Sequence, residues 1–220
     1  MTRNQFSSST LAERFGANAK FIDILRDLEI DAQQIGEVIC GIELNGRKIN
    51  ETEELFFHKL PVDEIQSLAI VTGRPLQLAQ GIVANWVKTL PDLVGTAEEI
   101  AESLKFDADE VSLQQFANLL DACQYLVESL MLLRAHFERE GDFKEIEANW
   151  SESEENLTKV VRQSIEAMEN KDFVLLSELV EYDLCGSLEA WVEVLTECQS
   201  RYFQAESNAQ NIGHRSDNNF

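Results

Sequence analysis

The sequence predicts a mostly α-helical protein, in which a small α+β unit of two or three strands precedes an acidic antiparallel bundle of four or five helices. Apolar residues within 113–137 recur in steps of three and four, which is helical spacing. A period of two replaces it over residues 38–44, and Asn45-Gly46 follows, which indicates a β-hairpin. The net charge is −22, and residues 75–220 hold 10 basic and 28 acidic side chains, a net of −18.

The first part of the chain contains the predicted strands. Residues 1–18 are expected to form a flexible N-terminus because they are largely polar. Residues 19–74 are expected to form a small α+β domain, with a helix over about 19–33, a hairpin that returns over 47–50, and a third strand over 67–72. An isolated hairpin is only marginally stable in water, so the helix is expected to cover one face of the strands.

Residues 75–204 are expected to form the helical bundle. Pro75 suits the first turn of a helix, and the amphipathic pattern that follows is expected to stop or kink at Pro91. Thr96 and Glu99 have the spacing of a capping box, which predicts that a new helix begins there.

The helix over 113–137 is expected to be the one around which the bundle packs. Ser112 and Gln115 predict its start as a capping box, and Gly141 predicts its end. Arg134 is the one charge on its inner apolar stripe. Either its head reaches water while its stem packs, or it forms a buried ion pair with a glutamate of another helix.

Two further helices are predicted after this central one. Asp142 is expected to cap the first, in which the polar segment 151–155 either bulges out or breaks the helix. The second spans about 173–202, and Gly186 within it indicates a kink or a close helix crossing. Residues 205–220 are polar without periodic apolar positions, and are expected to be a disordered tail.

The tryptophans and most of the cysteines fall on apolar helical stripes. We expect the three tryptophans to lie in the core: Trp86, Trp150 and Trp191. The cysteines are far apart and form no C-x-x-C motif; these are Cys40, Cys123, Cys185 and Cys198. Reduced thiols are the favoured interpretation, and a disulfide or metal-binding set is the alternative.

The sequence lacks the common motifs of catalysis and of cofactor binding. It contains no glycine-rich phosphate loop and no G-x-S-x-G segment, and none of its three histidines follows a glutamate at the spacing of a di-iron bundle. We therefore expect no catalytic residues, no cofactor and no metal. The longest apolar run is shorter than a membrane span of about 18–20 residues, and the first 15 residues lack a signal-like apolar region, so we expect a cytoplasmic protein.

Two groups of residues are candidates for binding a partner. Five acids cluster around the predicted turn at Gly141: Glu138, Glu140, Asp142, Glu145 and Glu147. They form either a solvated loop beside the start of the next helix, or a docking patch for a basic partner segment. Phe56 and Phe57 either pack in the core of the small domain or form an exposed protein contact.

Three segments carry a resemblance to a known group of proteins: IELNGRKI in the hairpin, LAIVTGRP at the third strand, and NKDFVLLSELVEYDL in the last helix. In this order they are similar to uncharacterised bacterial proteins that have a small hairpin-containing N-terminal domain and a C-terminal helical bundle. The resemblance spans nearly the whole chain and implies this two-part architecture and a bacterial cytosol, with no activity attached.

These observations favour a non-catalytic acidic protein-binding module, such as an adaptor, an assembly factor or a secretion-type chaperone. Its partner is expected to be a protein with a basic surface, because a strongly acidic surface repels nucleic acids and anionic membranes. A homodimer is compatible with the sequence. Two alternatives stay open: a nucleic-acid mimic that inhibits a DNA-binding protein, and an enzyme with an unrecognised carboxylate site.

Overall fold

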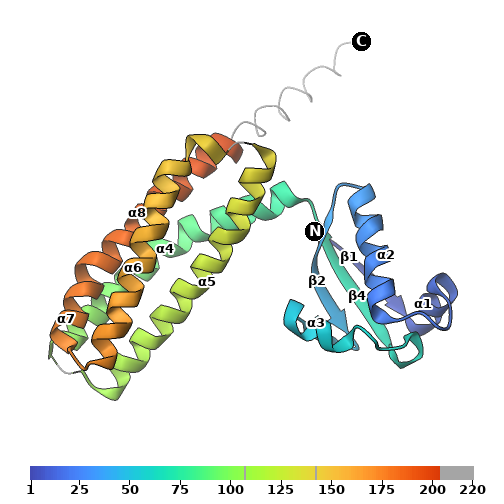
Figure 1. Cartoon of the computed structure of the whole chain (residues 1–220), viewed down its shortest axis with the longest axis horizontal. Coiled ribbons are helices and arrows are strands. Elements are labelled where there is room, and N and C mark those ends of the chain that lie inside the picture. Colours follow the sequence, from blue (N-terminus) through green and yellow to red (C-terminus); the bar gives the residue numbers. More distant parts are fainter. Residues whose placement is uncertain (107, 142, 204–220) are drawn as a thin grey trace, which may run out of the picture. The chain divides into compact units, whose positions relative to one another are not determined.

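The computed structural model describes residues 1–106, 108–141 and 143–203, with the backbone alone at residue 51. The chain divides into two compact units, the first over Met1–Leu78 and the second from Ala79 onward. Figure 1 shows strands and short helices in the first unit and long helices in the second. The predicted fold class, mostly α with a small α+β N-terminal unit, is therefore confirmed.

The first unit contains a four-stranded antiparallel sheet in the order β1-β4-β2-β3. The strands are β1 (Thr2–Ser7), β2 (Val38–Leu44), β3 (Arg47–Ile49) and β4 (Ser67–Gly73). The expectation of a flexible N-terminus over residues 1–18 is wrong, because β1 pairs along its full length with β4. The sheet thus has four strands, where two or three were predicted.

The hairpin between β2 and β3 turns at the predicted Asn45-Gly46. Both residues have positive φ, 51° and 80°, as a type I′ turn requires. The Asn45 side chain also accepts hydrogen bonds from the amides of Gln66 (2.7 Å) and Ser67 (3.1 Å). The turn is therefore tied to the start of the central strand β4.

Three helices and one short 3-10 turn accompany this sheet: α1 (Ser8–Phe15), α2 (Phe21–Gln34), α3 (Glu51–Phe57) and η1 (Val62–Glu64). Helix α2 lies along the sheet in Figure 1 and buries Phe21, Ile24, Leu25 and Leu28 in the core of the unit. The expected cover of the hairpin by a helix is therefore present.

The second unit consists of four long helical segments in the part of the chain that the structure describes. They are α4 (Pro75–Phe106), α5 (Glu110–Glu140), α6 (Glu147–Glu169) and a composite last segment. That segment joins α7 (Phe173–Glu178), a π-helical stretch η3 (Leu179–Leu184), α8 (Cys185–Cys198) and a second π-helical stretch η4 (Gln199–Phe203). A 3-10 turn, η2 (Phe143–Glu145), lies between α5 and α6.

Side-chain contacts connect these helices in the order α5, α4, α8 and α6. Trp86 of α4 lies against Tyr125 of α5, with ring centroids 5.6 Å apart. Trp150 of α6 meets Trp191 of α8 edge to face at 5.0 Å. The Cys185 thiol of α8 lies 3.9 Å from the Val94 carbonyl of α4. All three tryptophans are buried, which confirms their predicted place in the core.

Two predicted helix starts are wrong. Helix α4 continues through Pro91 to Phe106, and the Thr96 hydroxyl donates to the Asp92 carbonyl within the helix instead of capping a new one. Helix α5 starts at Glu110, because the Asp109 carboxylate accepts the amide of Ser112 at 2.8 Å and is the cap. The hydrogen bonds from Ser112 lower the pKa of Asp109.

The remaining helix predictions have mixed outcomes. Gly141 ends α5 with a φ of 84°, as expected. Helix α6 is continuous across residues 151–155, so this segment does not break it. Gly186 has open space where a side chain would project, so it marks no close crossing; the irregularity of the last segment is the π-helical stretch η3 just before it. Asp142 and residues 205–220 lie outside the described residues.

Candidate functional site

An apolar groove lies between helices α5 and α6 and has a volume of about 480 Å³. We call it the α5–α6 groove. Its aliphatic side chains and its thiol lie between two polar edges. The lining residues are Leu120, Asp121, Cys123, Gln124 and Val127 on α5, and Leu157, Thr158, Val161, Arg162, Ile165 and Glu166 on α6.

The groove follows from two rows of half-buried apolar residues at heptad spacing. On α5 the row is Leu113, Leu120 and Val127, and on α6 it includes Val161 and Met168. The inward stripe of α5, in contrast, is buried throughout: Leu119, Cys123, Leu126, Leu130 and Leu133. Leu120 and Val127 of the first row and Val161 of the second line the same groove, and all three are only partly buried.

An arginine lies beyond one end of the groove, seven residues after Val127 on α5. Arg134 donates to Glu154 of α6 at 2.7 Å and to Glu138 of its own helix at 2.9 Å. Its guanidinium also lies over the Phe143 ring, 5.2 Å from the centroid. The side chains of Arg134 and Glu154 are 33% and 41% exposed, so the guanidinium reaches water as the first alternative predicted. The pairing with a glutamate of another helix is present, but the predicted burial of that pair is wrong.

The opposite end of the groove is edged by exposed charges. Asp121 on α5 and Glu166 on α6 are acidic, and Arg162 is the basic residue among the lining side chains. The Cys123 thiol lies inside the groove wall, and burial raises its pKa to about 12. Because the thiolate is the reactive form, this cysteine is suited to packing and not to nucleophilic attack at neutral pH.

The acids predicted around Gly141 are mostly engaged by arginines of the chain. Glu138 pairs with Arg134 and Glu140 with Arg139. Glu145 pairs with Arg201 at 2.5 Å, and Glu147 lies exposed in the first turn of α6. These pairs reduce the net charge at this end of the bundle, so the predicted patch offers a basic partner less attraction than its five acids imply.

The two predicted phenylalanines point to different environments. Phe57 packs against the core of the first unit, whereas Phe56 is 81% exposed. Both lie in α3, where Asn50 caps the helix by accepting the amide of Glu53 at 2.8 Å. The structure therefore does not group them as one exposed contact.

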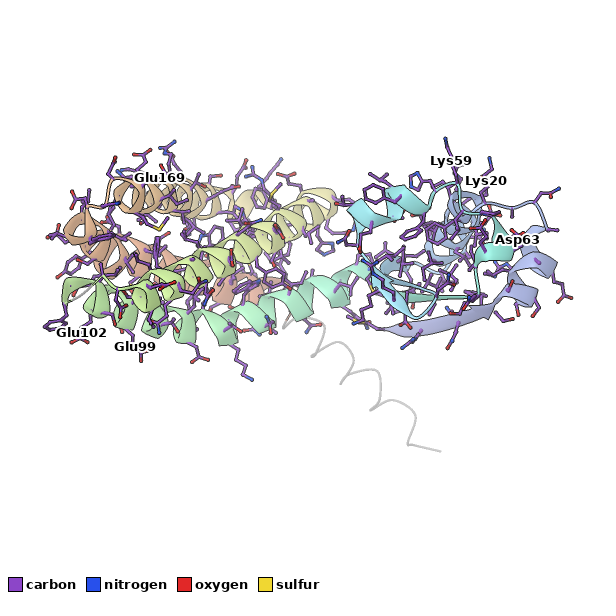
Figure 2. The ribbon with its side chains drawn as sticks, turned by 90° about the horizontal axis from the view of Figure 1, so that it is seen from below. Lys20, Lys59, Asp63, Glu99, Glu102 and Glu169 are labelled. Atoms are coloured by element: carbon purple, nitrogen blue, oxygen red, sulfur yellow. The ribbon has the colours of Figure 1, made fainter. Side chains whose placement is uncertain are left out.

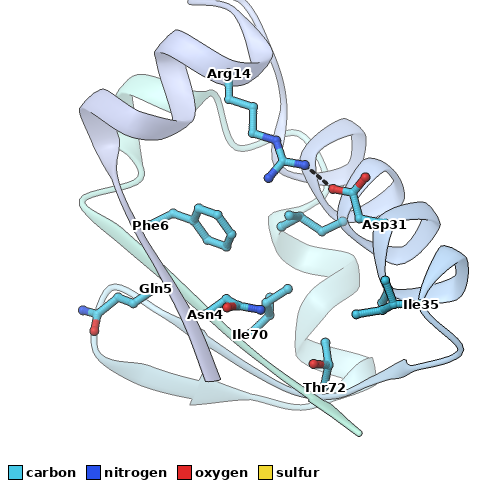
Figure 3. A pocket seen from close by; sticks show the side chains of 10 residues that line it. Asn4, Gln5, Phe6, Arg14, Asp31, Ile35, Ile70 and Thr72 are labelled. Atoms are coloured by element: carbon cyan, nitrogen blue, oxygen red, sulfur yellow. Dashed lines mark hydrogen bonds and ion pairs between the residues drawn. The ribbon is translucent and has the colours of Figure 1, made fainter. Parts of the chain in front are cut away.

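The first unit has a pocket of its own, of about 350 Å³, between β1, β4 and helices α1 and α2. Figure 3 shows Phe6 and Ile70 on its floor and the Arg14–Asp31 ion pair at its edge. Beside it, the Thr72 hydroxyl donates to Glu37 at 2.5 Å. Arg14, Asp31 and Thr72 are already bonded to partners within the unit. This pocket is therefore a weaker candidate for a binding site than the α5–α6 groove.

Within residues 1–106, 108–141 and 143–203, no group of three or more His, Cys, Asp or Glu side chains is arranged to hold a metal ion. Among the described helices, α5 alone is long and apolar enough to span a membrane, with a mean hydropathy of 1.2 over a stretch of 18 residues. The core helix of a helical bundle has the same length and apolar composition. In this structure Leu126, Leu130 and Leu133 of α5 are buried in the helical bundle.

The fold and the groove define an α+β unit joined to an acidic helical domain with one partly uncovered helix pair. The domain of unknown function DUF8042 matches residues 82–194, and the chain belongs to that family. The match contains both helices of the α5–α6 groove. No curated protein and no solved structure matches the chain.

Proposed function

We propose that the chain is a non-catalytic protein-binding module whose acidic helical domain docks a partner with a basic surface, as an adaptor, an assembly factor or a chaperone does. The observation that carries the proposal is the α5–α6 groove, an uncovered apolar surface in a strongly acidic domain. Contiguous apolar surface edged by polar residues is typical of protein interfaces.

The charge supports the same interpretation. A net charge of −18 over residues 75–220 attracts basic surfaces and raises association rates. Salt screens such attraction beyond about 8–10 Å at physiological ionic strength. The apolar centre of the interface is expected to govern dissociation, so salt should slow association more than it speeds dissociation.

The test compares three full-length proteins as baits in the cytosol of the source cells. They are the wild type, the groove variant Val127→Asp, and the control Leu132→Asp, which places the same charge on an exposed position of α5 outside the groove. We expect the wild type and the control to retain a protein that the groove variant does not retain. The rate at which this protein associates with the wild type should fall as the salt concentration rises.

Two outcomes would contradict the proposal. If the groove variant retains every protein that the wild type retains, the groove is not a docking site. If the captured protein binds DNA, and DNA displaces the chain competitively, the nucleic-acid mimic replaces the adaptor as the function.

A further inference from the structure

We propose that the α5–α6 groove holds one amphipathic helix of the partner, about two turns long at the contact, with its basic side chains at Asp121 and Glu166. The proposal rests on the proposed function and names the occupant of the same site. It follows from the length of the groove, from the hydrogen bonding of its walls and from the distribution of charge along it.

The length of the groove fits a short helical contact. Its apolar residues run from Leu120 to Val127 on α5 and from Leu157 to Ile165 on α6. At 1.5 Å per residue these stretches are about 10–12 Å long. Anchors at positions i, i+3 or i+4, and i+7 of a docked helix span about the same distance, so three anchor side chains fill the groove.

The walls favour a helix over an extended strand. The groove lies between two α-helices, whose backbone amides and carbonyls bond within each helix. An extended segment would need hydrogen-bond partners for its own backbone, and the aliphatic side chains Leu120, Val127 and Val161 supply none. A docked helix satisfies its backbone internally and needs only apolar contacts.

The charges give the contact a direction. Arg134 beyond one end is neutralised by Glu138 and Glu154. At the other end the acids Asp121 and Glu166 face a single arginine among the lining residues, Arg162. Near these residues the exposed acids Glu128, Glu155 and Glu169 outnumber the exposed base Lys159, so the net charge beside the groove stays negative. A second copy of the chain is a poor occupant because each copy has a net charge of −22.

The first test uses designed peptides of about 14 residues, or four helical turns. One peptide places leucines at i, i+4 and i+7 beside lysines, the second replaces the lysines with glutamates, and the third scrambles the first. Fluorescence anisotropy on the full chain is expected to show saturable binding of the lysine peptide alone. Val127→Asp or Val161→Asp should weaken it by at least about tenfold, since an unpaired charge is costly in an apolar site. Leu132→Asp should not weaken it.

The second test exchanges the charges at the open end. Asp121→Lys with Glu166→Lys should change the preference from the lysine peptide to the glutamate peptide. The control, Glu99→Lys with Glu102→Lys, makes the same net change on α4 and should keep the original preference. Figure 2 shows these two control residues on the side of the helical domain away from Glu169 of α6.

Photocrosslinking makes the test independent of the variants' folding. A photoreactive residue at the central leucine of the lysine peptide should crosslink within residues 120–127 or 157–165 of the wild-type chain. Crosslinks elsewhere, or an equal effect of both charge exchanges, would overturn the helix-in-groove contact. If no peptide binds while the groove variant still loses its protein partner, the helical occupant is wrong and the proposed function stands; if neither effect is seen, both fail.

Discussion

The Arg134–Glu154 ion pair is expected to stabilise the register of α5 against α6 by about 0.5–1 kcal/mol. The atoms Nη1 and Oε2 are 2.7 Å apart, but the side chains are 33% and 41% exposed, so water screens the pair. Exposed ion pairs contribute about 0.2–1 kcal/mol, and this geometry belongs in the upper half of that range.

The perturbation is a double-mutant cycle of Arg134→Met, Glu154→Gln and both together. Methionine keeps an apolar side chain over Phe143 while it removes the charge. Arg134→Met alone should cost about 1–2 kcal/mol, because it also removes the bond to Glu138 and the contact of the cation with the Phe143 ring. The cycle isolates the coupling between Arg134 and Glu154.

The assay is urea unfolding followed by circular dichroism, at low salt and at about 1 M salt, where the Debye length is about 3 Å. The coupling energy should fall at high salt. A coupling below about 0.2 kcal/mol at low salt, or one that salt leaves unchanged, would refute the reasoning. Apolar packing would then set the register of the two helices without help from the pair.

Two further predictions concern the core of the helical domain. Leu126→Ala should lower the free energy of unfolding in urea by about 2–5 kcal/mol, because Leu126 is fully buried. The control Leu132→Ala, at a 65% exposed position of the same helix, should lower it by less than about 1 kcal/mol. Equal losses would mean that α5 is not central. The thiol of Cys123 should resist alkylation at neutral pH while the exposed Cys40 reacts, and mass spectrometry locates the label. Burial raises the pKa of the Cys123 thiol to about 12, above that of an exposed thiol. The unfolded state therefore releases the proton first, and stability should fall by up to about 1.4 kcal/mol per pH unit as the pH rises from about 9 towards 12. The variant Cys123→Ala should remove this contribution.

Local patterns in the sequence predicted most of the fold, and the errors come from contacts distant in the sequence. The Asn45-Gly46 turn was predictable because its requirement for positive φ is local. Strand β1 was not, because Phe6 is its one large apolar residue and its partner β4 lies 60 residues further on. Pro91 indicated a helix end, yet α4 accommodates it and continues to Phe106.

The α5–α6 groove was not predictable for a different reason. Leu120, Val127 and Val161 have the same heptad spacing as the buried Leu119, Leu126 and Val160, so the pattern alone cannot separate a covered row from an uncovered one. The acids at Glu138, Glu140 and Glu145 were found by their clustering. The pairs that Glu138 and Glu140 form with Arg134 and Arg139 lie within α5, whereas the pairing of Glu145 with Arg201 depends on the folded arrangement of η2 and η4.

The groove and the charge of the helical domain act together under the proposed function. Half-buried aliphatic residues such as Val127 and Val161 would favour association of two copies through the same surface. The net charge of −22 on each copy opposes that association and attracts a basic partner. One distribution of acids therefore supplies both the repulsion of the wrong partner and the attraction of the right one, which is how specific interfaces discriminate. The acids at the open end, Asp121 and Glu166, are the ones placed to exert both effects at the contact itself.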